Sequence, residues 1–391
     1  MKKKIAVITA TRAEYGLLRP FVEEMIKENE FICELLVTGT HLLERYGKTV
    51  QFIEADGIPI RYKLPIMNEE ENEQCDVIAK AITSFSRVYE REKYDAIVVL
   101  GDRYELYGFC IPALLHRIPI IHIHGGEKTE GAVDEKIRHS ITKMASLHFP
   151  SIDEYAKRII QMGENPKYVY PVGALGIDNA MRLTLIEQEQ LEQELGVDFS
   201  KKIAIVTFHP VTLDGLENAK KQAKIVFQTL VEMDLFLIVT MPNSDMGGEI
   251  ITKIILAYAK KYPNKIKFVK SLGQIRYLSC LKYASIVIGN SSSGIIETAS
   301  FKIPTVDIGD RQRGRMAPKN VIHCDCEQKC IEEAVKKGLS ESFREQLADY
   351  VNPYGDGKAA TRMVSILKQL NWEDIGLVKK EFYDIDFGVP R

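Results

Sequence analysis

The segment KKIAVITATRAEYG (residues 3–16), near the N-terminus, indicates the fold. It opens with a short apolar run, and the sequence that follows predicts an amphipathic helix from about Tyr15 to Glu28. A similar apolar run starts again at KKIAIVTF (residues 201–208). A buried strand followed by a helix is the repeating unit of parallel α/β sheets. Two separate starts therefore predict two α/β domains in one chain.

Further apolar runs follow each start, and helical stretches separate them. In the first half they are FICELLVTG (31–39), YDAIVVLG (94–101) and PIIHIHGG (119–126). In the second half they are FLIVTMPN (236–243), KIKFVKSL (265–272), ASIVIGN (284–290) and IPTVDIG (303–309). This alternation predicts an α/β fold of two doubly wound, Rossmann-like parallel sheets. We expect an N-terminal domain over residues 1–172 and a C-terminal domain over 173–353, because Gly and Pro punctuate residues 171–182.

The composition narrows the class of protein. The chain has 391 residues, of which 45% are hydrophobic and 27% charged, and its formal net charge is -2. Binding to nucleic acid or to a membrane surface needs a basic excess, so we expect neither. The apolar run at the N-terminus is only about six residues long before Arg12 and Glu14, too short for a signal peptide. With no stretch long enough to span a membrane, we expect a cytoplasmic protein.

The cysteines predict neither disulfides nor a metal site. The chain has seven, an odd number scattered along the sequence, which favours reduced thiols. Three of them cluster as CDCEQKC (residues 324–330), but the spacing fits no common zinc pattern and no His completes it.

Polar residues gather in the loops that follow the predicted strands. These loops include TATRAEYG, TGTHLLERYG, GDRYE, HIHGGEKTEGAVDE, FHPVT, MPNSDMGG, GNSSSG and GDRQRGR. In open parallel sheets, ligands bind outside the carboxyl ends of the strands. Any single loop of this kind could be a solvent-exposed loop without a function. Eight together predict an active-site cleft between the two domains.

The loop GNSSSGIIE (residues 289–297) points to a phosphate-bearing ligand. Three hydroxyls, on Ser291, Ser292 and Ser293, precede an expected helix whose free N–H groups favour anions. A single Ser would be explained as a helix cap, but three between glycines favour a diphosphate. Glu297 would accept hydrogen bonds from a ribose. Neither GxGxxG after the first strand nor GxxxxGK[ST] is present, which argues against nicotinamide or P-loop cofactors.

Carboxylates form a second candidate cluster. Asp102 and its neighbour Arg103 follow one strand, and Glu127 and Asp134 follow the next. Several carboxylates at one pocket can divide acid and base roles through separated pKa values. Asp134 is also placed to cap the helix that follows it, and both roles remain open. Arg138 and His139 are expected to pair on that helix.

Other residues at strand ends are weaker candidates. His209 would stabilise a leaving phosphate or carry a proton, and Arg12 and Arg311 suit phosphate recognition through their planar guanidinium groups. Packing or salt bridges would explain the same three residues without a ligand. The remaining candidates for contacts to sugar or nucleotide are His41, Asn243 and Asp245.

Taken together, these motifs identify a family. The segments TRAEYG, VLGDRYE, HIHGGEKT with DEKIRHSITKM, FHPVT, GNSSSGIIE, IGDRQRGR and EFYDI run almost from end to end. With them the chain resembles the hydrolysing UDP-N-acetylglucosamine 2-epimerases of bacterial sialic acid synthesis, and the epimerase half of the bifunctional animal enzyme. The resemblance implies a glycosyltransferase-B-like fold with UDP bound mainly by the second domain. It also implies that residues 354–391 pack back on the first domain, and that the protein is a homodimer or homotetramer.

The resemblance also implies roles for individual residues. The residues that would contact UDP are Arg12, His209, Ser291, Ser292, Glu297 and Arg311. Asp102, Asp134 and a glutamate would be the catalytic carboxylates. In some relatives that glutamate lies two residues after the His of this strand, where the present chain has His124. We assign the role to Glu127, three residues further on, with His124 as the alternative.

The family chemistry is an elimination followed by a hydration. A base removes the C2 proton, UDP leaves from C1, and water adds to the resulting 2-acetamidoglucal to give free N-acetylmannosamine. We expect Asp102 and Glu127 to move the C2 proton, Asp134 to orient, and His209 to act near the leaving phosphate. The scheme requires no metal and no redox cofactor. Alternatives are the same reaction on a UDP-2,4-diacetamido-2,4,6-trideoxyhexose for legionaminic acid, a non-hydrolysing epimerase, a glycosyltransferase of this fold, and a nucleotide-sugar sensor.

Overall fold

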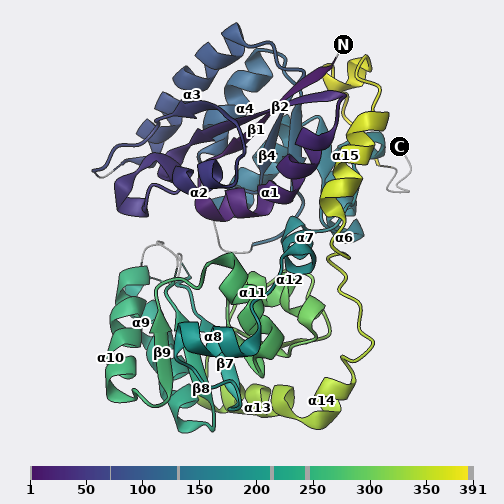
Figure 1. Ribbon diagram of the computed structural model, residues 1–391. Coiled ribbons are helices and arrows are strands. Elements are labelled where there is room, and N and C mark those ends of the chain that lie inside the picture. The colour runs from purple at the N-terminus through teal and green to yellow at the C-terminus, as the bar shows by residue number, and fades with distance from the viewer. Residues whose placement is uncertain (1, 71, 130–132, 212–214, 243–246, 386–391) are drawn as a thin grey trace. The chain divides into compact units, whose positions relative to one another are not determined.

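A computed structural model describes residues 2–70, 72–129, 133–211, 215–242 and 247–385. The chain divides into two compact units (Figure 1). The first unit combines the N-terminal part of the chain, up to Asn179, with the segment that begins at Tyr354. The second unit is built on Ala180–Pro353.

The first unit holds a six-stranded parallel sheet in the order β3-β2-β1-β4-β5-β6. The strands are β1 (Lys3–Thr9), β2 (Phe31–Thr38), β3 (Ile60–Leu64), β4 (Ala96–Leu100), β5 (Ile120–Ile123) and β6 (Leu147–Phe149). The helices are α1 (Arg12–Lys27), α2 (Val50–Ala55), α3 (Gln74–Arg91), α4 (Leu106–Leu115), α5 (Val133–Met144), α6 (Asp153–Gln161) and α15 (Ala359–Gln369). Helix α7 (Leu175–Arg182) leads into the second unit.

The second unit repeats this architecture, with the strand order β12-β11-β10-β7-β8-β9. Its strands are β7 (Ile203–Thr207), β8 (Phe236–Thr240), β9 (Ile266–Val269), β10 (Ile286–Gly289), β11 (Thr305–Ile308) and β12 (Val321–Cys324). Its helices are α8 (Gln188–Leu195), α9 (Leu216–Glu232), α10 (Gly248–Lys261), α11 (Gly273–Tyr283), α12 (Ser293–Ile296), α13 (Gln328–Leu339) and α14 (Glu341–Glu345). The predicted fold of two doubly wound parallel sheets is therefore confirmed.

Each sheet is buried on both faces, which explains its continuous apolar strands. In β1, Ile5 and Val7 pack into the core beneath α1 and α15, while Ala6 and Ile8 pack into the core beneath α3 and α4. The second unit uses β7 in the same way. The strands that the sequence did not reveal are β3, β6 and β12. All three lie at the edge of their sheet, and each is short or only partly buried.

The C-terminal segment belongs to the first unit. Helix α15 packs beside α1 (Figure 1). Its N-terminus is capped from a distant part of the chain, because the buried carboxylate of Asp178 accepts hydrogen bonds from the N–H groups of Ala359 (2.8 Å) and Ala360 (2.7 Å). Tyr354 adds a hydroxyl contact of 2.8 Å to Tyr155.

Each sheet has one topological switch point, where the order of its strands reverses. The reversal falls between β1 and β4 in the first sheet and between β7 and β10 in the second. Ligands of doubly wound sheets bind at these points, beyond the carboxyl ends of the strands. Among the residues that the structure describes, no helix is long and apolar enough to cross a membrane.

Removing the Asp178 cap tests how strongly the C-terminal segment is held. We expect Asp178→Ala to lower the free energy of unfolding by about 3 kcal/mol, because two buried N–H groups lose their acceptor. Urea unfolding measures the change, and the exposed Asp349→Ala provides a matched control. Equal losses in the two variants would contradict this account of the cap.

Candidate active site

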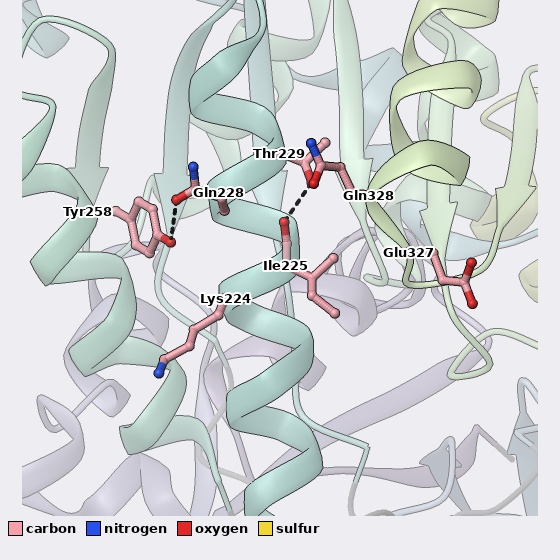
Figure 2. Close-up of a pocket in the computed structure, with 7 residues that line it drawn as sticks. All are labelled: Lys224, Ile225, Gln228, Thr229, Tyr258, Glu327 and Gln328. Atoms are coloured by element: carbon pink, nitrogen blue, oxygen red, sulfur yellow. Dashed lines mark hydrogen bonds between the residues drawn. The ribbon is translucent and has the colours of Figure 1, made fainter.

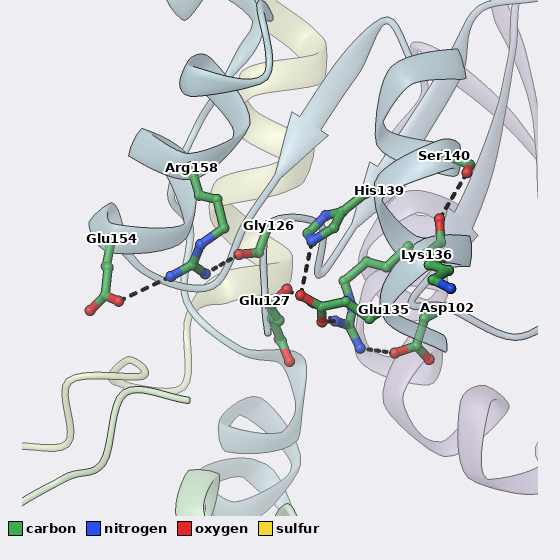
Figure 3. A network of polar contacts seen from close by, with 10 residues as sticks. Asp102, Gly126, Glu127, Glu135, Lys136, His139, Ser140, Glu154 and Arg158 are labelled. Atoms are coloured by element: carbon green, nitrogen blue, oxygen red, sulfur yellow. Dashed lines mark hydrogen bonds and ion pairs between the residues drawn. The ribbon is translucent and has the colours of Figure 1, made fainter. Parts of the chain in front are cut away.

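A buried arginine organises the carboxylates of the first unit. Arg138 of α5 is only 1% exposed and forms an ion pair with Asp102, which follows β4. It also contacts the Glu135 carboxylate at 3.1 Å and donates to the backbone oxygen of Glu127 at 3.0 Å. Figure 3 shows Asp102, Glu127 and Glu135 together in this network. Because a buried guanidinium needs compensating charge, Arg138 draws the loops after β4 and β5 to one point.

The turn after β5 has an unusual backbone. His124 has φ +62°, a left-handed conformation that side chains with a Cβ rarely adopt. Its Nδ1 lies 3.5 Å from Oε1 of Glu127, and both side chains are buried. Gly126 has φ +77°, and a Cβ there would lie 2.4 Å from the backbone oxygen of Tyr155. The HIHGGE motif therefore packs His124 against Glu127, and strain of this kind is common at functional sites.

Helix α5 overturns one expectation and confirms another. It begins at Val133, so Asp134 lies inside the first turn instead of at the N-cap, and its side chain is exposed. The expected pairing along the helix is present, because Glu135 contacts Arg138 and also His139 at 3.2 Å. Arg138, however, reaches beyond the helix to Asp102.

In the second unit, Asn290 joins the loops at the switch point. Its side chain accepts from the N–H of His209 at 2.7 Å and donates to the His209 oxygen at 2.9 Å. Its own backbone oxygen accepts from Arg311 at 3.0 Å and from Gln312 at 2.9 Å. Three loops thus meet at a buried amide. Sequence reasoning quoted this loop but did not single out Asn290 or Gln312.

The serine loop differs from its predicted form. Helix α12 is only four residues long, so its dipole is weaker than that of the longer helix the sequence predicted. Ser291 and Ser292 are partly exposed, whereas the Ser293 hydroxyl is turned toward Glu297 and Tyr277. Burial raises the pKa of Glu297 to about 7, against the lowering effect of the Ser293 hydrogen bond. Gly289 is required here, because a Cβ would lie 1.9 Å from the Thr207 oxygen.

The arginines at the first switch point have separate surroundings. Arg12 is the first residue of α1, with its guanidinium 4.6 Å from the centre of the Phe52 ring, and it is exposed. Helix α1 begins three residues earlier than predicted because the Thr11 side chain caps it. The Arg103 guanidinium contacts the Glu105 carboxylate at 2.6 Å.

His41 has the geometry of a core residue. It is 0% exposed, and its ring nitrogens lie 3.1 Å from the Thr9 hydroxyl and 2.8 Å from the Thr49 hydroxyl. Burial lowers its pKa to about 4. The structure therefore gives His41 no surface for a sugar. The spacing of TGTH places it at the correct edge of the sheet but does not reveal its depth.

Two of the predicted ligand-contacting residues and the clustered cysteines remain to be placed. Asn243 and Asp245 lie outside the described residues. Cys324, Cys326 and Cys330 are free and partly buried. Within the described ranges, no group of three or more His, Cys, Asp or Glu side chains is arranged to hold a metal ion.

A separate pocket on the second unit contains none of these candidates. Figure 2 shows its lining of Lys224, Ile225, Gln228, Thr229, Tyr258, Glu327 and Gln328. These residues come from α9, α10 and the start of α13, on the helical layer of the unit. Its polar groups partly satisfy one another, as the Tyr258 hydroxyl does by donating to the Gln228 side chain at 3.1 Å.

The raised pKa of Glu297 predicts a pH effect on stability. The folded protein binds this proton more tightly than the unfolded chain, so the Glu297 contribution falls as pH rises from about 4.5 to about 7. Glu297→Gln removes this term, and its melting temperature relative to wild type should be higher at pH 8 than at pH 5. An equal difference at both pH values would contradict the assignment.

Comparison with known proteins identifies the relatives of the chain. Residues 23–368 match the family model described as UDP-N-acetylglucosamine 2-epimerase. The chain is 37% identical to the GDP/UDP-N,N'-diacetylbacillosamine 2-epimerase (hydrolyzing) of Campylobacter jejuni, over 98% of this chain and 100% of that protein. It is 37% identical to the polysialic acid biosynthesis protein P7 of Escherichia coli, with coverage of 98% and 98%.

A further relative resembles the chain over nearly its whole length, and a solved structure shares its fold. The UDP-N,N'-diacetylbacillosamine 2-epimerase (hydrolyzing) of Legionella pneumophila is 35% identical, over 95% of this chain and 97% of that protein. The fold matches the crystal structure of UDP-GlcNAc 2-epimerase from Neisseria meningitidis with a TM-score of 0.81, at 18% identity and coverage of 94% and 100%. The chain therefore belongs to the UDP-N-acetylglucosamine 2-epimerase family.

Proposed function

We propose that the protein is a hydrolysing 2-epimerase that splits a UDP-linked 2-acetamido sugar into UDP and the free C2 epimer. The observation that carries the proposal is the network around Arg138. It holds the Asp102 carboxylate next to the turn that packs Glu127 against His124. A reaction that removes a proton from C2 and returns one to the opposite face needs two such groups. The family and the hydrolysing relatives support the same chemistry.

The residues divide the reaction into two tasks. In the first unit, Asp102 and Glu127 exchange the proton at C2, with Arg138 fixing the orientation of Asp102. In the second unit, the hydroxyls of Ser291 and Ser292 and the loops joined by Asn290 bind the diphosphate, where negative charge grows as UDP leaves. Arg12, His209 and Arg311 would stabilise the same charge, and Glu297 would accept hydrogen bonds from the ribose. Asp134, exposed in the first turn of α5, would act at the rim of the site.

For the sugar, we propose a UDP-2,4-diacetamido-2,4,6-trideoxyhexose. Support comes from the hydrolysing diacetylbacillosamine 2-epimerases of C. jejuni and L. pneumophila, which are 37% and 35% identical over almost the whole chain. A second candidate is UDP-N-acetylglucosamine, with N-acetylmannosamine as the product for sialic acid synthesis. It is favoured by the E. coli polysialic acid biosynthesis protein, which is also 37% identical.

The two sugars can be compared directly by UDP release from the purified protein. We expect kcat/KM for UDP-N,N'-diacetylbacillosamine to exceed that for UDP-N-acetylglucosamine by at least about tenfold. A polar site tuned to one substituent discriminates strongly against an analogue that lacks it. The reverse preference would favour the second candidate, and a UDP-linked epimer without UDP release would identify a non-hydrolysing enzyme.

The role of Asp102 is tested by Asp102→Asn. We expect kcat to fall by about 10³-fold, since proton transfer by a positioned group contributes this much, while the affinity for UDP stays within about twofold of wild type. Steady-state kinetics and calorimetric titration with UDP measure the two quantities. Asp349→Asn, an exposed change of the same kind, should alter neither. Loss of UDP binding in Asp102→Asn would give Asp102 a structural role instead.

A further inference from the structure

A second polar cluster lies beside Asp102 at the switch point of the first sheet. It consists of Glu14, in the first turn of α1 after β1, together with Arg103 and Glu105, which follow β4. Strands β1 and β4 are neighbours in the sheet, so the two loops lie at the same edge. Glu14 is 4% exposed and Glu105 is 0% exposed. Burial of this extent is unusual for charged side chains outside a site or an ion pair.

The contacts within the cluster account for only part of its polar atoms. One oxygen of Glu14 accepts from the N–H of Ala10 at 2.6 Å, and the Arg103 guanidinium donates to one oxygen of Glu105 at 2.6 Å. Glu14 also lies within electrostatic reach of the other two groups. Burial raises the pKa of Glu14 to about 7, the Arg103 charge lowers it and the Glu105 charge raises it. The cluster therefore contains two carboxyl groups and a single guanidinium.

Three buried atoms of the cluster have no hydrogen-bond partner among the described residues. They are Oε1 of Glu14, Nε of Arg103 and Oε2 of Glu105. Leaving such atoms unsatisfied costs about 1–3 kcal/mol each, so native sites fill them. Two acceptors and one donor are groups that bound water can satisfy, because a water molecule donates two hydrogen bonds and accepts others. The contact with the N–H of Ala10 satisfies Oε2 of Glu14 but leaves Oε1 without a partner.

We propose that Glu14, Arg103 and Glu105 bind the water molecule that is consumed in the hydration step. The inference rests on the proposed function, because only a hydrolysing epimerase adds water to C1. As the acid group protonates C2 of the glycal, the water oxygen forms a bond to C1 and Glu14 accepts one water proton. The remaining hydroxyl becomes the C1 hydroxyl of the free sugar, so one water is consumed in total. Since Arg103 follows Asp102 directly, one loop serves both the C2 proton and the water.

The test is the fate of the sugar in Glu14→Gln, followed by proton NMR with UDP-N,N'-diacetylbacillosamine and with UDP-N-acetylglucosamine. The amide keeps an acceptor for the N–H of Ala10 and leaves the Thr11 cap of α1 in place, but it cannot take a proton from water. We expect UDP release to continue while the glycal becomes the main sugar product. In wild type the free epimer should account for nearly all of it. Glu105→Gln should shift the ratio of glycal to free sugar in the same direction.

Glu23→Gln, an equivalent change further along α1 at a partly exposed site, serves as the control and should give the wild-type ratio. A wild-type ratio in both Glu14→Gln and Glu105→Gln would overturn the water site. So would a parallel loss of UDP and free sugar without any glycal, which would make the cluster structural. If wild type releases no UDP from either sugar, the proposed function fails, and this inference fails with it.

Discussion

The ion pair between Arg138 and Asp102 is the interaction on which the first unit's site depends. Arg138 is almost completely buried, and its partners come from the loop after β4, the turn after β5 and its own helix α5. Removing one partner of a buried ion pair typically costs about 3–5 kcal/mol, because the other charge is left uncompensated. The same contacts that satisfy Arg138 therefore place Asp102 and the Glu127 turn.

In the second unit, a neutral side chain instead of an ion pair joins the loops that follow the strands. Asn290 directly follows β10 and hydrogen-bonds to the backbone of His209, while Arg311 and Gln312 donate to its own oxygen. A buried amide can satisfy donors and acceptors at once without the desolvation cost of a charge. Each switch point is thus organised by one buried polar side chain that joins loops distant in sequence.

The sequence predicted the architecture and the edge of each sheet where polar residues gather. This prediction succeeded because strands that are buried on both faces of a parallel sheet consist of continuous apolar residues. The edge strands β3, β6 and β12 escaped because they are short or only partly buried. Depth and pairing were harder to predict. His41 lies at the expected edge of the sheet, but its side chain is completely buried. Arg138 pairs with a residue 36 positions away in the sequence. Spacing along one helix reveals the Glu135 contact but not the Asp102 contact.

The proposed function requires that C2 loses its proton before water adds at C1. Incubating the wild-type protein with its UDP-sugar in deuterated water, and following the products by proton NMR, measures this order. We expect UDP and a free C2-epimeric sugar with deuterium at C2 in every product molecule. A free sugar that keeps the original hydrogen at C2, or that retains the original configuration, would contradict the proposed elimination and the proposed roles of Asp102 and Glu127.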